Sequence, residues 1–391
     1  MNKDRFVFLF LLGLSLVVHF GVVQLKGFSL TQDFQTIYDP LARQVVAWVN
    51  EGTDFPKIHG AAEFFHLNYV FFVAAVYLLF GVGNYVALIS LQIILASFSY
   101  LVIFDVLRKH LSFWWVAIGT AVMTFIFFES VFLNTAGSPE SLYRSLLILA
   151  YFPIIQLYLK KRYASFFTVA AVAFLVLLFI RIETVFLFLP CYALSLSIIS
   201  EKLGMKDLSP ARAAFAIVLL VVAVSLFTKT HIFRHEIFMA DRDYFIRGIV
   251  VADLGPAGRI EPFDTNLADS VTYVLERGSR LFVLRVTQFL NIFPPSWSAG
   301  HKIYYAAHMV PFYILFIFGV MGAWRRRDFT FLMVTFLYIS AAITHGLTRV
   351  DAAHRTNFIS IVFLVMLAGY GLDQLCQRYL KKTRLPASSP A

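Results

Sequence analysis

Long apolar segments, most of them close to twenty residues, recur along the whole chain and alternate with short polar segments. A helix needs about 20 apolar residues to cross the hydrocarbon core of a bilayer. The pattern therefore predicts an all-α, polytopic transmembrane helix bundle of about ten spans. The predicted spans cover residues 6–25, 86–107, 111–133, 141–159, 165–181, 184–200, 212–230, 303–323, 329–346 and 356–374.

Residues 64–80 (FFHLNYVFFVAAVYLLF) are apolar but short, and the basic residues elsewhere decide their place. Cytoplasmic loops of membrane proteins are enriched in Lys and Arg. If residues 64–80 do not cross, 17 of the chain's 33 Lys and Arg residues face the cytoplasm, together with both termini. If they cross, every later basic cluster faces outward. We therefore expect a re-entrant or interfacial helix at 64–80 on the outer face.

Two outer segments are expected, a first loop at 26–63 and a large loop at 231–302. In the first, Asp39 followed by a proline predicts a helix start, with Asp39 as the N-cap. The apolar and polar residues that follow, up to residue 50, are typical of a helix lying along the membrane surface. Residues 1–374 are thus expected to form one transmembrane domain, followed by a cytoplasmic tail at 375–391.

Composition supports a membrane protein and excludes several other classes. Only 14% of the residues are charged, against roughly a quarter in soluble proteins. The net charge of +10 comes from short basic clusters beside the spans, which indicates topology rather than nucleic-acid binding. Two cysteines form no disulfide framework or metal motif. The sequence indicates no cofactor and defines no metal site. Whether the protein uses a divalent metal stays open.

The ionisable residues gather at the predicted outer ends of the spans, whereas the span centres are nearly free of charge. A transporter is expected to hold such groups near the midplane. A layer at the outer boundary instead suits chemistry on a lipid-linked substrate whose head group lies there. The residues in this layer are Asp33, Asp39, Glu63, His66, Glu129, Glu140, Arg144, Arg181, Glu183, His345, Arg349, Asp351, His354 and Arg355.

Asp33 follows the first span by only a few residues, so it lies near the membrane surface. It is either a general base for an acceptor hydroxyl or an ordinary solvated carboxylate. Arg349, His354 and Arg355 offer cationic donors for a phosphate, or they anchor a helix end at the interface.

Two shorter motifs complete the candidate site, and both have a structural alternative. Arg181, in the turn RIET at 181–184, is a second phosphate-binding candidate or forms a salt bridge within the turn. Glu140, in SPESL at 138–142, has a functional role or simply favours a helix N-terminus. No sequence feature decides between these alternatives.

Taken in order, these segments resemble the GT-C superfamily of polytopic membrane glycosyltransferases, which use polyprenyl- or dolichyl-phosphate sugars. The likeness covers most of the chain. Asp33-Phe34 followed by Tyr38 resembles the family's first-loop motif, and the aromatic-rich helix ending at Phe80-Gly81 follows it. SPESL, RIETVFLFLP and HRTNFISIVFLVMLAGYGL resemble its later motifs. The chain departs from the family pattern at Phe34, where many members carry a second acid, and at Phe65-His66-Leu67-Asn68.

The resemblance implies an inverting, mannosyltransferase-like transfer of a hexose or pentose on the extracytoplasmic face. The acceptor is a glycan, a lipid or a protein. Apart from the resemblance, the compact loops and the lack of glycosylation-style or retention signals favour a bacterial inner membrane. By the resemblance, Asp33 is the catalytic base. Arg355, with Arg181, Arg349 and His354 behind it, binds the donor phosphate. Tyr38, His66, Glu140 and Glu183 are expected to contact the substrate.

Two other classes stay open. A lipid-linked polysaccharide ligase or polymerase would centre its site on Arg and His residues of the large outer loop. A flippase or transporter would move its substrate without forming a bond and would tolerate loss of the Asp33 charge.

Overall fold

The computed structural model describes residues 3–58, 66–181, 183–202, 299–348 and 355–383. Within these ranges the chain is all-α, with thirteen α-helices, one π-helical turn and two very short strands. The strands are β1 (Ser29–Leu30) and β2 (Ala136–Gly137), and the π-helical turn is η1 (Phe34–Tyr38). The helices are α1 (Lys3–Lys26), α2 (Asp39–Glu51), α4 (Leu67–Phe80), α5 (Tyr85–His110), α6 (Trp114–Ile126), α7 (Phe128–Asn134), α8 (Pro139–Leu159), α9 (Tyr163–Leu178), α10 (Thr184–Leu187), α11 (Leu189–Lys202), α15 (Ala299–Arg326), α16 (Phe329–Thr348) and α17 (Arg355–Thr383).

Five of the described helices are long and apolar enough to cross a membrane: α1, α5, α8, α15 and α17. A multi-pass membrane protein is therefore plausible from length and hydropathy. Three further apolar helices, α4, α6 and α9, fall below that length, and so does the apolar stretch Phe329–Thr344 within α16. The predicted span 212–230 lies outside the described residues. The total of about ten spans therefore remains an expectation from the sequence.

Two predicted spans are interrupted in the structure. The segment predicted as one span at 111–133 is divided at Phe127 into α6 and α7, and the segment at 184–200 is divided at Phe188 into α10 and α11. Phe127 has a non-helical backbone, with ψ of 132°, which ends the run of helical hydrogen bonds. Both phenylalanines are buried, so neither break leaves an aromatic ring exposed.

The basic ends of several helices gather at one end of the bundle, which we call the basic end. It contains four arginines and three aspartates: Arg108, Arg325, Arg326, Arg378, Asp4, Asp328 and Asp373. Arg108 at the end of α5 donates to Asp4 at the start of α1 over 2.7 Å. His110 contacts Asp328, between α15 and α16, at 2.9 Å. Helices α1 and α5 therefore run in opposite directions. The segment between them begins and ends at the other end of the bundle, opposite the basic end.

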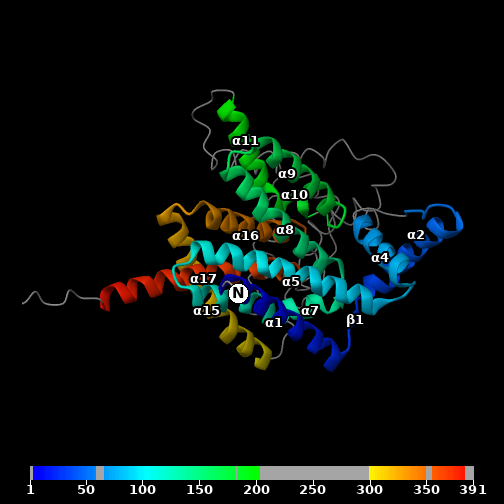
Figure 1. Ribbon diagram of the computed structural model, residues 1–391, viewed down its shortest axis with the longest axis horizontal. Coiled ribbons are helices and arrows are strands. Elements are labelled where there is room, and N and C mark those ends of the chain that lie inside the picture. The colour runs from blue at the N-terminus through cyan, green and yellow to red at the C-terminus, as the bar shows by residue number, and fades with distance from the viewer. Residues whose placement is uncertain (1–2, 59–65, 182, 203–298, 349–354, 384–391) are drawn as a thin grey trace, which may run out of the picture.

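At the other end of α5, helices α2 and α4 pack against each other beside β1 (Figure 1). Helix α4 has 14 residues and is about 21 Å long, shorter than the ~30 Å hydrocarbon core. The amphipathic pattern predicted for α2 holds over its first two turns, where Leu41, Ala42, Val45 and Val46 are buried. Its last apolar residues, Trp48 and Val49, are exposed instead.

Candidate functional site

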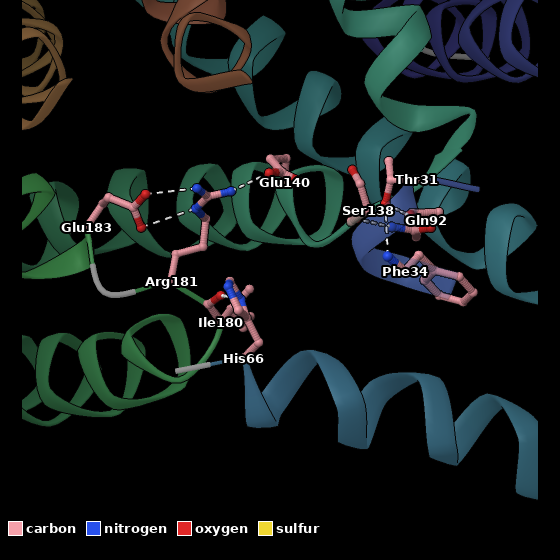
Figure 2. Close-up of polar contacts among 10 residues, drawn as sticks. Thr31, Phe34, His66, Gln92, Ser138, Glu140, Ile180, Arg181 and Glu183 are labelled. Atoms are coloured by element: carbon pink, nitrogen blue, oxygen red, sulfur yellow. Dashed lines mark hydrogen bonds and ion pairs between the residues drawn. The ribbon is translucent and has the colours of Figure 1, made fainter. Parts of the chain in front are cut away.

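The segment that carries Asp33 is held against the start of α8. Strand β1 pairs in parallel with β2, so that Ser29 lies opposite Ala136. The Thr31 hydroxyl donates to the Gly137 carbonyl over 3.0 Å and accepts from the Phe34 amide over 3.3 Å. Figure 2 shows these contacts beside the side chain of Gln92, which donates to the Ser138 carbonyl over 2.8 Å. The first loop is thus anchored to Ala136 and Gly137, directly before the SPESL motif.

Asp33 immediately precedes the π-helical turn η1 and is partly buried. π-helical turns are rare, and they occur frequently at functional sites. The next residue, Phe34, is fully buried, with its ring edge-to-face against Tyr85 at 5.9 Å between centroids. The buried ring of Phe34 holds the backbone in place and so positions the neighbouring residue, Asp33.

Asp39 does not cap a helix, and the prediction that it does is wrong. An N-cap needs a non-helical backbone, but η1 continues directly into α2 and Asp39 is itself helical, with φ −64° and ψ −48°. Its carboxylate instead accepts from Arg43 Nε over 2.9 Å, from the Tyr85 hydroxyl over 3.3 Å and from the Tyr77 hydroxyl. Asp39 therefore ties α2 to α4 and α5.

Tyr38 and His66 come together at the start of α4. The buried Tyr38 ring lies edge-to-face against His66, with centroids 5.1 Å apart, and against Tyr69 at 5.2 Å. His66 Nδ1 lies 2.6 Å from the Ile180 carbonyl, which makes that nitrogen the donor. Burial and the neighbouring Arg181 guanidinium lower the pKa of His66 below its ordinary value. A neutral imidazole thus joins the first loop to the turn after α9.

Asn68 reinforces the same junction. Its backbone amide donates to the Phe179 carbonyl over 2.9 Å, and its side chain donates to the Val176 carbonyl over 2.8 Å. Carbonyls of the last helical turn have no partner within their own helix. Helix α4 therefore caps the end of α9.

Arg181 lies between two carboxylates, as Figure 2 shows. Its Nη1 donates to Glu140 over 2.5 Å, and its Nη2 and Nε donate to the two oxygens of Glu183 over 2.8 and 3.2 Å. Burial alone favours the neutral form, but Glu183 and Glu140 outweigh it and raise the pKa of Arg181 above its ordinary value. The salt bridge within the turn, one of the two alternatives from the sequence, is present. We call these three residues the carboxylate–arginine cluster.

Four predicted site segments are thus joined in space: Tyr38 to His66, the His66 ring to the 180–181 turn, and that turn to Glu140. Arg355 begins α17, but its side chain lies outside the described part of the structure, as do Arg349 and His354. The predicted large outer loop 231–302 is described only at its last four residues, which begin α15. The roles assigned to these residues stay predictions.

A buried polar network inside the bundle was not predicted, although one of its members, Arg144, was assigned to the outer layer from the sequence and is instead fully buried. Asn134 donates through its side-chain nitrogen to His19 Nε2 over 2.8 Å and to the Tyr100 hydroxyl over 3.0 Å. Arg144 Nη2 donates to the Tyr100 hydroxyl over 2.7 Å and to Asn134 Oδ1 over 2.8 Å. The network joins α1, α5, α7 and α8 one turn below Glu140. A histidine in the middle of an otherwise apolar first span was the available signal.

Within the described residues, no group of three or more His, Cys, Asp or Glu side chains lies close enough to hold a metal ion. Comparison with protein-family models and with curated proteins finds no match to this chain. The functional argument therefore depends on the geometry of the site and on the resemblance of its motifs.

Proposed function

We propose that this chain is an integral-membrane, inverting glycosyltransferase of the GT-C type. It moves a sugar from a polyprenyl-phosphate donor to a glycan, lipid or protein acceptor on the extracytoplasmic face. The observation that carries the proposal is the convergence of the first loop, the start of α4, the SPESL motif and the RIET turn through direct contacts. These segments are separated by up to about 150 residues in the sequence, yet they are the ones that resemble the family's motifs.

In the proposed reaction, the Asp33 carboxylate accepts the proton of an acceptor hydroxyl. The hydroxyl oxygen attacks the anomeric carbon of the donor as the bond from that carbon to the phosphate oxygen breaks. The bonding electron pair leaves on the lipid phosphate, and the anomeric configuration inverts. General base catalysis of this kind contributes about 10²–10⁴-fold, and cations near the phosphate stabilise the charge that develops on it.

Among the proposed phosphate ligands, Arg355, Arg349 and His354 bind the phosphate of the donor. Arg181 is better suited to positioning, because each of its three nitrogens already donates to a carboxylate. Tyr38 and His66 adjoin this cluster and form the aromatic side of the proposed substrate site. Glu140 and Glu183 act there chiefly by orienting the 180–183 turn.

The proposed placement in the membrane follows from charge. Lys and Arg concentrate on the cytoplasmic side of membrane proteins, so the basic end faces the cytoplasm with both termini. The first loop then lies on the outer face. The membrane itself is proposed to be a bacterial inner membrane on the sequence features given above. The outward position of Asp33 puts it at the boundary where a polyprenyl phosphate holds its sugar.

The proposal is tested by reconstituting the protein in sealed vesicles with synthetic polyprenyl-phosphate sugars. A glycosyltransferase releases polyprenyl phosphate and forms a glycosylated product in equal amounts. A flippase moves the labelled lipid across the vesicle without forming a product. Movement without bond formation, across a panel of hexose and pentose donors, would overturn the proposal.

A further inference from the structure

A small pocket opens at the basic end, between the last turns of α15 and residues 374–378 of α17. Its volume is about 190 Å³. This is below the ~300–1,000 Å³ typical of pockets that hold drug-sized ligands. It is lined by Gly322, Arg325, Arg326, Gln374, Gln377 and Arg378. The lining therefore contains three guanidinium groups and no carboxylate.

The charge of this pocket is not neutralised by its surroundings. Within the described part of the chain, neither Arg325 nor Arg378 forms an ion pair, and Arg326 donates to the neutral amide of Gln377 over 2.5 Å. The neighbouring carboxylate of Asp373 accepts from the Phe113 amide over 2.9 Å and from Gln377 over 2.5 Å. Asp328 contacts His110. Neither carboxylate lines the pocket, although Asp373 bonds to the lining residue Gln377. The three guanidinium groups outnumber these two carboxylates, so the pocket favours an anion.

Gln374 adds an independent sign of a ligand. Its side chain lines the pocket and is only 7% exposed, and its amide nitrogen forms no hydrogen bond within the described residues. A buried donor without an acceptor costs about 1–3 kcal/mol. The terminal amide torsion is broad, so a small rotation presents this donor to an oxygen bound beside the arginines.

An apolar stripe on α15 leads directly to the pocket. Ile314, Ile317 and Met321 are exposed and lie three or four residues apart, which puts them on one helix face. Trp324, 75% exposed, ends the stripe beside Arg325, and Tyr379 is exposed on α17. Because α15 is one of the five candidate spans, an exposed apolar stripe on it is suited to contact with acyl chains. Trp and Tyr residues are typical of the level of the lipid head groups.

We propose that the pocket binds the phosphate head group of an anionic membrane lipid, with its acyl chains along the α15 stripe. The arginines supply charge-assisted hydrogen bonds to the phosphate oxygens, and Gln374 supplies a neutral donor. Basic pockets between helices on the cytoplasmic side are suited to such head groups. The inference is independent of the proposed catalytic activity.

The test is native mass spectrometry of the purified protein with added phosphatidylglycerol or phosphatidylcholine. We expect one phosphatidylglycerol to bind at least tenfold more tightly than phosphatidylcholine. The double variant Arg325→Ala/Arg378→Ala loses this preference. The matched control Lys160→Ala/Arg162→Ala removes two exposed basic charges in the predicted cytoplasmic turn before α9 and keeps the preference. Gln374→Leu preserves the charge and weakens binding several-fold.

Three results would overturn the inference. The first is equal binding of the two lipids by the unaltered protein. The second is loss of the preference in the charge-matched control as well as in the pocket variant, which would show a general charge effect. The third is displacement of the lipid by millimolar inorganic phosphate, which would show a site for a free anion. Thermal unfolding of each variant checks that the fold is retained.

Discussion

Replacing Arg181 by glutamine should destabilise the protein strongly, because it removes the cation of the carboxylate–arginine cluster. The side chains of Arg181 and Glu140 are only 7% and 6% exposed. Removing one partner of a buried ion pair costs about 3–5 kcal/mol, since a charge is left in a poorly hydrated place. In Arg181→Gln, two carboxylates lose the guanidinium between them, so we expect a loss at the upper end of that range.

The companion variant Glu140→Gln should cost less. It removes one charge-assisted hydrogen bond, worth about 1.5–3 kcal/mol, and leaves Arg181 bound to Glu183 through two nitrogens. On the Arg181→Gln background, however, Glu140→Gln removes one of the two facing negative charges. The double variant should therefore be more stable than Arg181→Gln alone, which is a reversal of sign between backgrounds.

The assay is equilibrium unfolding in mixed detergent micelles, with the free energy of unfolding measured for all members of the cycle. Arg43→Gln is the matched control, because Arg43 pairs with Asp39 but is 44% exposed. An exposed pair contributes at most about 1 kcal/mol. If Glu140→Gln costs the same in both backgrounds, or if Arg181→Gln costs no more than Arg43→Gln, the assigned cluster energetics are wrong.

Three further predictions concern the first loop and α4. The pKa of His66 is lowered in the folded protein, so unfolded chains bind more protons below about pH 6.5 and stability should fall as the pH drops below that value. His66→Asn keeps a donor for the Ile180 carbonyl and should flatten this pH dependence of the unfolding free energy; an unchanged slope would contradict it. Asp39→Asn should lower stability by about 1–3 kcal/mol while turnover per folded molecule changes less than tenfold, because Asp39 ties helices together. Phe34→Ala should cost about 3–5 kcal/mol by opening a cavity, measured by the same unfolding assay; a cost below 1 kcal/mol would show that this ring is not an anchor.

The long helices were predictable because each has a continuous apolar run with polar ends. The span predicted at 86–107 corresponds to α5 (Tyr85–His110), and that at 141–159 to α8 (Pro139–Leu159). The breaks at Phe127 and Phe188 were not predicted, because one non-helical residue changes neither hydropathy nor composition. The prediction of Asp39 as an N-cap failed for a related reason. Asp-Pro is a helix-start signal, but this signal does not reveal that a π-helical turn precedes it.

The sequence named candidate site residues, whose roles stay predictions, but it could not give the contacts among them. The acid, aromatic and basic residues at the span ends are visible in the sequence, and so is the order of the motifs. The pairing of Arg181 with Glu140, 41 residues away, depends on how α8 packs beside the turn after α9. Likewise the contact of His19 with Asn134 spans 115 residues. Hydrophobic periodicity specifies which face of a helix is buried, not which helix covers it.

The central claim is that the Asp33 carboxylate is the base for sugar transfer, and a comparison of two Asp→Asn variants tests it most directly. Asp54 is an exposed acid of the same loop, and its replacement serves as the matched control. In the reconstituted assay, Asp33→Asn should lower the rate of glycosylated product formation per folded molecule by about 10²–10⁴-fold, while Asp54→Asn keeps full activity. Equal activity of Asp33→Asn and Asp54→Asn at saturating donor would contradict the account.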